Sequence, residues 1–186
     1  MAEPQAAFNT LVELATRSRR SARGLPAQAN VQQQWSGIGF TLMDQYFVSP
    51  MGEISELLEL PSFTQLPGVQ PWVMGVANVR GRLLPLFDMA MYFGGALDGQ
   101  RKRHRVLVLE QDGLYSGLVV DSAMGMQHFV ADSFNAGKEG LDPDLQSLVI
   151  GSYAQNLAAD KDDDQRWFVF SPKKLAEDAR FVNAAQ

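Results

Sequence analysis

The sequence predicts a mainly β domain, and three observations support that prediction. From Trp35 to Phe170 the chain holds about ten short segments in which apolar residues alternate with polar or small ones. Turn-forming residues (Gly, Asp, Asn and Pro) separate these segments at fairly regular spacing. No long helical pattern alternates with them. Short strands at this spacing are typical of a barrel or a sandwich rather than of alternating β and α units.

Composition agrees with one domain, or two small lobes sharing a core, and excludes several function classes. Of the 186 residues, 46% are hydrophobic and 20% are charged, as in ordinary globular proteins. The net charge of -5 disfavours a nucleic-acid binder, which carries a basic surface. With no cysteine and two histidines, the chain offers no disulfide, thiol nucleophile or Cys/His zinc site, so we expect no metal or other cofactor. No membrane span or secretory signal is found, and we expect a cytoplasmic protein.

The N-terminal segment differs from the rest and predicts a helix followed by a linker. Apolar residues recur at helical spacing over residues 5–20, and a basic run follows at residues 17–23. The apolar stripe consists of Phe8, Leu11, Val12 and Ala15. Two interpretations remain open: the helix packs on the domain, which we favour because the stripe is small, or it lies on a membrane surface. Residues 27–34 resemble a linker, so we divide the chain into 1–34 and 35–182.

The strands follow from alternation and from the turns between them. Asp44 and Gln45 form the first turn, and residues 111–113 form the turn of the clearest hairpin. Pro85 has no amide N–H to donate, which predicts that its strand lies at an edge or is bulged there. The predicted strands are Ile38–Leu42, Tyr46–Val48, Ile54–Leu60, Val73–Asn78, Arg82–Phe87, Lys102–Leu109, Leu114–Val120, Gly125–Val130, Leu148–Tyr153 and Arg166–Phe170.

Two loops and one helix complete the predicted elements. Residues 135–145 contain glycine, proline and several charges and are expected to form a loop. Residues 160–164 are acidic, but the glycine and the bidentate Glu of a calcium loop are missing, so we expect a solvated loop. Ser171 and Pro172 suit the N-cap and first turn of a C-terminal helix over residues 172–180.

The search for a catalytic site gives one weak candidate. The phosphate-binding G-x-x-x-x-G-K-[ST] motif and the nucleophile elbow G-x-S-x-G are absent. His128 is a possible base for Ser122 or partner of Asp121, and Asp88 is a possible partner of Asp121 in acid–base chemistry. His104 lies in a basic run and is expected at the surface. The alternative function is therefore a small β-barrel hydrolase or ligand-binding enzyme that uses Asp88, Asp121 and His128.

The most distinctive segment covers residues 71–88 and predicts a tight hairpin. Two apolar strands flank the polar turn segment Asn78–Gly81. Gly81 provides the positive φ that such a turn requires, and the strands hold Arg80 at its tip. Arginine makes several directed hydrogen bonds at once, so it suits an interface anchor. From spacing alone, an ordinary hairpin with an exposed arginine is the simpler alternative.

This segment resembles the signature of the CheW-like family, the chemotaxis coupling proteins. The family pattern G-V-x-N-x-R-G, an apolar run with a proline, and then Asp corresponds to Gly75–Gly81, Pro85 and Asp88. The resemblance extends over residues 36–181. Within the family, the chain is most similar to the chemosensory adaptors of type IV pilus systems, which control twitching motility. The segments that suggest this are 35–40, 65–69, 125–129 and 168–172.

The resemblance implies both a fold and a function. The implied fold is two five-stranded, SH3-like β-barrels sharing a hydrophobic core, with short N- and C-terminal helices. Members are not enzymes and need no cofactor. They couple the cytoplasmic tip of a methyl-accepting chemoreceptor to the CheW-like regulatory domain of a CheA-type histidine kinase, within membrane-associated arrays. No nucleic acid and no direct membrane insertion are expected.

The resemblance also implies site residues. It places a strand glutamate, here Glu56, close to the hairpin arginine, Arg80. Glu56 shares a strand face with apolar residues, and a half-buried carboxylate requires a cationic partner. The alternative is that Glu56 points to solvent at a sheet edge. The implied receptor-binding residues are Asn78, Val79, Arg80, Ile54 and Glu56, and the implied turn glycines are Gly75 and Gly81.

Overall fold

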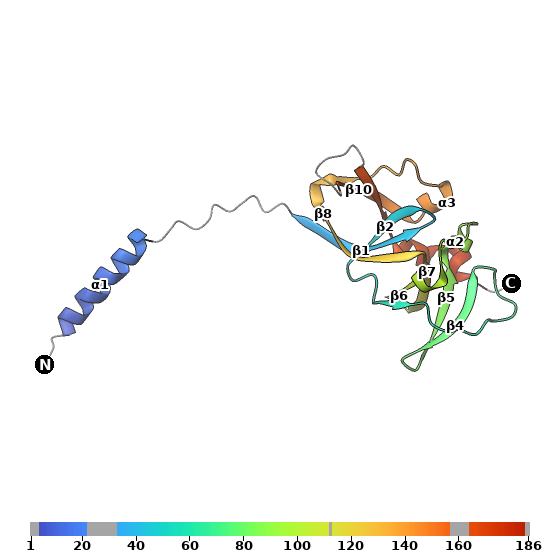
Figure 1. The fold of residues 1–186 in the computed structure, drawn as a ribbon, viewed down its shortest axis with the longest axis horizontal. Coiled ribbons are helices and arrows are strands. Elements are labelled where there is room, and N and C mark those ends of the chain that lie inside the picture. The colour runs from blue at the N-terminus through green and yellow to red at the C-terminus, as the bar shows by residue number, and fades with distance from the viewer. Residues whose placement is uncertain (1–3, 22–32, 112, 157–163, 185–186) are drawn as a thin grey trace. The chain divides into compact units, whose positions relative to one another are not determined.

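The chain forms two compact units, residues 1–32 and 33–186. The computed structural model describes residues 4–21, 33–111, 113–156 and 164–184 (Figure 1). Most of the predicted linker and of the acidic loop at 160–164 lies outside these residues. Within the described residues, no helix has the length and apolar character needed to cross a membrane.

The first unit contains helix α1 (Pro4–Ser21), which confirms the predicted helix. Its apolar side chains are exposed, from 48% for Val12 to 65% for Leu11. Whether this apolar face packs on the domain, as favoured above, or lies on a membrane surface stays a prediction.

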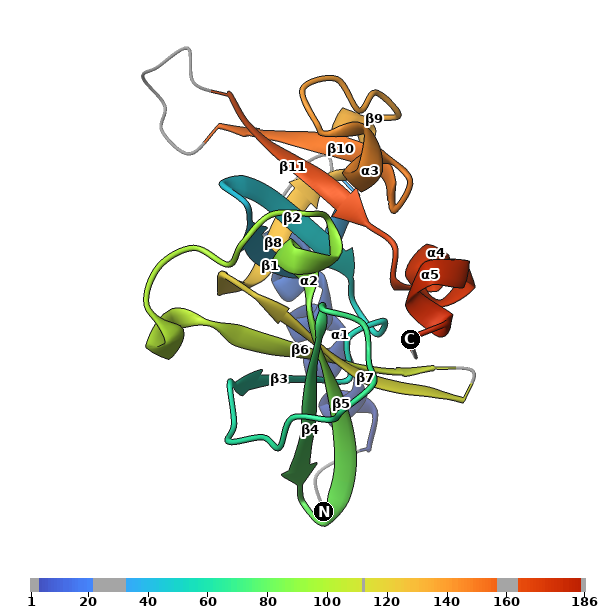
Figure 2. The same cartoon turned by 90° about the vertical axis from the view of Figure 1, so that its right-hand side faces the viewer.

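The second unit contains two curled sheets (Figure 2). The first has six strands in the order β8-β1-β2-β11-β10-β9. Its neighbouring strands pair antiparallel, except that β11 pairs in parallel with β2. This parallel pair joins the start of the domain to its end. The strands are β1 (Gln34–Leu42), β2 (Gln45–Pro50), β8 (Ser122–Val130), β9 (Phe134–Asn135), β10 (Val149–Asn156) and β11 (Asp164–Phe170).

The second sheet has five strands in the order β3-β6-β7-β5-β4. It too has one parallel pair, between β5 and β7, among antiparallel ones. The strands are β3 (Glu56–Glu59), β4 (Val73–Val79), β5 (Arg82–Asp88), β6 (Arg105–Gln111) and β7 (Leu114–Val120).

The predicted mainly β fold of two barrel-like lobes is confirmed, with corrections. The first lobe has six strands rather than five, because β9 pairs with β10 where a loop was expected. Helix α3 (Pro143–Gln146) lies in the same expected loop. The strand that holds Pro85 is not an edge strand, because β5 lies between β7 and β4. The predicted alternative, an irregularity near Pro85, agrees with the register shift between Val73 and Gly75 of β4, next to the residue that pairs with Pro85. Pairing with β7 starts at Leu86, so the missing N–H of Pro85 interrupts no bond on that side.

Short helices connect the strands and close the domain. The predicted C-terminal helix is interrupted at Asp178, whose carboxylate accepts from the N–H of Arg180 and caps a second helix. Ser171 caps the first of the two, as predicted. The short helices are α2 (Met89–Tyr92), α4 (Pro172–Glu177), α5 (Ala179–Val182) and the 3₁₀ turns Arg101–Arg103 and Ala131–Ser133.

The hydrophobic core has a shared part and one part inside each lobe. The shared part draws on both sheets, for example Phe47 and Phe168 from the first and Leu107 from the second. Along β6, Leu107 faces this shared core while Val106 and Val108 face the interior of the second lobe. Burial on both faces explains why β6 has a continuous apolar run rather than strict alternation.

Candidate functional site

The hairpin between β4 and β5 has the tight turn that the sequence predicts. Arg80 and Gly81 form its two central residues, with φ angles of 52° and 81°. A positive φ is uncommon for a residue with a Cβ, so this backbone needs local support. Asn78 provides it, because its Oδ1 accepts a hydrogen bond of 2.9 Å from the N–H of Gly81. The turn therefore fixes where the Arg80 side chain starts.

The expected ion pair between Glu56 and Arg80 is present. Nη2 of Arg80 donates to Oε1 of Glu56 over 2.5 Å. Glu56 lies on β3 and Arg80 follows β4, the two opposite edge strands of the second sheet. The pair therefore bridges the edges that meet as the sheet curls into a barrel. The Arg80 side chain is 79% exposed and that of Glu56 is 27% exposed, so the guanidinium remains accessible to a partner.

A second arginine extends this charged site. Nη1 of Arg82 donates to Oε1 of Glu110 over 2.8 Å, and its guanidinium carbon lies 3.9 Å from the ring centroid of Tyr115. Sequence reasoning did not select Arg82, although it lies in the same R-G-R segment as Arg80. The three residues Arg82, Glu110 and Tyr115 come from neighbouring strands, so only strand order brings them together.

The residues of the site surround a shallow pocket of about 270 Å³. Val79 lies at its wall and packs against the interior core of the second lobe. The lining residues are Ser55, Glu56, Val79, Arg80, Arg82, Val108, Glu110 and Tyr115. Beside the turn, Leu83 is 70% exposed, which adds an apolar contact point next to the charged groups.

Of the remaining expected residues, Gly75 is not where it was predicted, and the receptor contact of Ile54 stays a prediction. Ile54 is half-buried against the shared core and does not line the pocket at Arg80. Gly75 is not a turn residue, since it lies inside β4 at a register shift. A Cβ there would clash with the carbonyl oxygen of Thr64, which forms a β-bridge through Val76. Gly75 is therefore required by close backbone approach and by its φ of 141°.

Sequence reasoning also missed an exposed apolar pairing on the first sheet. Met126 on β8 is 52% exposed and lies directly opposite Ile38 of β1. Ile38 packs against the shared core, so Met126 continues that core onto the surface. Its flexible thioether suits contact with a helical partner. The sequence does show the spacing behind this pairing, since Met124, Met126 and Val130 occupy alternate positions along β8.

The residues of the alternative enzyme do not all come together: Asp88 and Asp121 lie close enough to interact electrostatically, whereas His128 and Ser122 have other partners. His128 Nδ1 lies 2.7 Å from Ser36 Oγ, whereas the Ser122 hydroxyl pairs with that of Thr41. Ser122 and His128 stand at separate ends of β8, roughly 20 Å apart at about 3.3 Å per residue. Their expected pairing is therefore wrong. No metal-binding cluster of His, Cys, Asp or Glu occurs among the described side chains.

The acidic candidates have structural partners. Asp88 caps α2 by accepting from the N–H of Met91 over 2.8 Å. Burial raises the pKa of Asp88 and that of Asp121, although backbone N–H donors oppose the shift in both. His104, expected at the surface, is only 8% exposed, because a 3₁₀ turn directs the chain inward before β6. Its Nε2 lies 3.0 Å from the carbonyl oxygen of Asp98.

Comparisons with known proteins identify the family of this chain. Residues 36–180 match the model of the CheW-like domain. The chain belongs to the CheW-like family. It is 45% identical to Protein PilI of Pseudomonas aeruginosa over 185 residues, which cover 100% of this chain and 99% of PilI. It is 28% identical to the chemotaxis protein CheW of Helicobacter pylori, over 61% of this chain and 68% of that protein.

A solved structure shows the same fold. The scaffolding protein TtCheW from Thermoanaerobacter tengcongensis superposes with a TM-score of 0.60 at 21% identity, covering 75% of this chain and 90% of TtCheW. CheW-like proteins are non-catalytic scaffolds of chemosensory signalling, and this chain is a scaffold of that family. The exposed hairpin with its ion pairs is therefore a candidate interaction site rather than a catalytic one.

Proposed function

We propose that this chain couples the cytoplasmic tip of a methyl-accepting chemoreceptor to the CheW-like regulatory domain of a CheA-type histidine kinase. The signal controls type IV pilus twitching motility, and the protein acts in the cytoplasm within membrane-associated receptor arrays. Family membership supports the coupling role, and similarity to PilI over the whole chain supports the pilus system. The single observation that carries the receptor site is the exposed Arg80, which is ion-paired with Glu56 and lies in a turn that Asn78 stabilises through the N–H of Gly81.

The geometry suits a helical receptor tip. Arg80 uses one N–H on Glu56 and retains further donors, which remain accessible because most of the side chain is exposed. The turn and the ion pair already restrict Arg80 in the free protein. Binding therefore costs less conformational entropy of this side chain, which favours affinity. Val79 and Leu83 place apolar atoms beside the charge. A helix with a carboxylate and apolar side chains on one face is complementary to this surface.

Kinase binding is proposed at the ends of the barrels, with no residues assigned. Such contacts are small and apolar, so we expect modest affinity and weak dependence on salt. The competing surface is the basic run Arg101–Arg105, where salt would weaken binding. Calorimetric titration of the kinase regulatory domain at low and high ionic strength separates the two. A loss of affinity of about tenfold or more on adding salt would move the kinase site to the basic run.

The coupling function is tested by assembling the three purified components. We expect the tagged chain to retain a receptor cytoplasmic fragment and the kinase regulatory domain together. Arg80→Ala should release the receptor and keep the kinase, because only the receptor uses the hairpin. Arg166→Ala is the matched control, because it removes an exposed, ion-paired arginine from the six-stranded sheet, away from the hairpin. Receptor retention unchanged in Arg80→Ala would show that the receptor binds elsewhere.

A further inference from the structure

The chain crosses from the second lobe to the first through a single residue. Strand β7 ends at Val120 in the five-stranded sheet, and β8 begins at Ser122 in the six-stranded sheet. Asp121 is the residue between them and is 7% exposed. A crossing this short gives its backbone little freedom, so its side chain is well placed to bond to both lobes.

The Asp121 carboxylate does bond to both lobes. Its Oδ2 accepts a hydrogen bond of 2.8 Å from the N–H of Met43, in the turn between β1 and β2. Its Oδ1 accepts one of 2.6 Å from the N–H of Asp98, in the segment between α2 and β6. The N–H of Asp121 also donates to the carbonyl of Thr41 over 3.1 Å. Each carboxylate oxygen therefore holds a backbone group of a different lobe.

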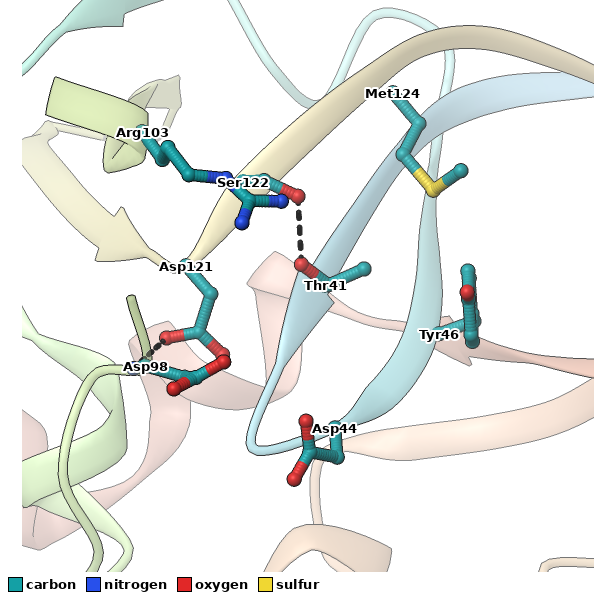
Figure 3. Close-up of a pocket in the computed structure, with 8 residues that line it drawn as sticks. All are labelled: Thr41, Asp44, Tyr46, Asp98, Arg103, Asp121, Ser122 and Met124. Carbon is teal, nitrogen blue, oxygen red and sulfur yellow. Dashed lines mark hydrogen bonds between the residues drawn. The ribbon is translucent and has the colours of Figure 1, made fainter. Parts of the chain in front are cut away.

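Further contacts fix the two donors. His104 Nε2 lies 3.0 Å from the carbonyl oxygen of Asp98, which adds a second polar contact on that residue. The Met43 side chain packs on the backbone at Gly95, where a Cβ would clash with it. Figure 3 shows the Asp121 carboxylate directed at Asp98 beside a pocket of about 280 Å³ that both lobes line. Charged groups on this pocket are Asp44, Asp98, Arg103 and Asp121.

We propose that Asp121 is a positioning residue whose carboxylate fixes the angle between the two lobes. The consequence for function rests on the proposed coupling role. In that role, the angle between the lobes fixes the orientation of the receptor-binding surface relative to the kinase-binding surface. Apolar burial in the shared core is not directional, so it defines the angle less sharply than directional bonds do. Hydrogen bonds to two defined N–H groups are directional. Asparagine offers one acceptor oxygen instead of two and cannot hold both donors.

The angle can be measured directly, because the chain has no cysteine. Glu59→Cys on the second lobe and Asp132→Cys on the first provide exposed sites for two spin labels. We expect a narrow distance distribution in the labelled parent and a shifted or broadened one in Asp121→Asn. Asp98→Ala is the matched control: it removes a carboxylate from the same pocket and keeps the backbone N–H, so it should match the parent. An unchanged distribution in folded Asp121→Asn overturns the proposal, whatever the protein's function.

A second variant covers the case in which Asp121→Asn does not fold. Asp98→Pro removes the N–H donor in the second lobe and leaves Asp121 in place, so it should also broaden the distribution. The link to function is measured by three-component assembly. We expect Asp121→Asn to lower ternary assembly about fivefold or more while each pairwise affinity stays within about twofold. A changed distance with unchanged assembly would keep the positioning role and overturn its link to the scaffold function.

Discussion

Two carboxylates of this domain make hydrogen bonds in opposite settings. Glu56 bonds to the exposed guanidinium of Arg80 at the rim of the second lobe. Asp121 bonds to the backbone N–H groups of Met43 and Asp98 at the boundary between lobes, where it is almost fully buried. Water can replace either partner in the pair of Glu56 and Arg80, but it has little access to the hydrogen bonds of Asp121. The first arrangement is therefore available for exchange with a binding partner, whereas the second holds the fold.

The difference shows why charge alone does not identify a binding residue. An exposed ion pair contributes little to stability, since water and salt screen it. A buried carboxylate costs desolvation, which raises the pKa of Asp121, and the N–H groups of Asp98 and Met43 offset part of that cost. We therefore expect changes at Asp121 to alter stability and changes at Arg80 to alter binding.

The largest expected effect is on stability at Asp121. Asp121→Ala leaves the N–H groups of Met43 and Asp98 without an acceptor, which should lower the free energy of unfolding by about 2–3 kcal/mol. Glu56→Ala should change it by about 0.5 kcal/mol or less. Urea unfolding followed by circular dichroism measures both. Equal losses in the two variants would remove the distinction between the sites.

The next effect is on receptor affinity at Arg80. Arg80→Ala should weaken binding by about 2 kcal/mol, or about 30-fold, if the partner buries this side chain. The free energy of unfolding should remain nearly unchanged, because the side chain is 79% exposed. Calorimetry with the receptor fragment measures the affinity, and Arg166→Ala, at an exposed ion pair of the six-stranded sheet, serves as the control. A loss of stability as large as the loss of affinity would make Arg80 a structural residue.

A smaller effect is the coupling within the exposed pair. A double-mutant cycle on Glu56 and Arg80, measured by urea unfolding, should give a coupling of about 0.2–1 kcal/mol. Adding salt should reduce it, because both groups are reached by solvent. A coupling of zero at low salt would mean that Glu56 does not hold Arg80 in the free protein.

The smallest effect concerns pH and Asp88. Burial raises the pKa of Asp88 above its unfolded value, so the folded state favours its protonated form. Its contribution to stability is fully present below the unfolded pKa and is lost as pH rises through the raised folded pKa. Asp88→Asn keeps an N-cap side chain and removes this titration. Stability measured from about pH 4 to about pH 7 should therefore fall less in the variant than in the parent. A pH dependence identical in both proteins would contradict the assignment.

The sequence by itself determined the features that depend on local chemistry. Alternation located nearly all the strands, and the Asn78–Gly81 segment specified its own turn, because Asn and Gly supply the bond and the positive φ within a few residues. Ser171 capped its helix for the same local reason. The family motif also pointed to the pairing of Glu56 with Arg80, which spacing alone left open.

Only the tertiary structure decided which strands share a sheet and which side chains are buried. The parallel pairs β2–β11 and β5–β7 join distant segments, and no local pattern encodes such partners. Strand order placed β5, which contains Pro85, between β7 and β4, and the fold brought a close backbone contact to Gly75. Asp121 and Met43 are far apart in sequence, so their bond, and with it the role of Asp121, follows from how the lobes pack. Directed contacts between distant segments depend on the whole fold, which is the physical reason that the sequence alone did not reveal them.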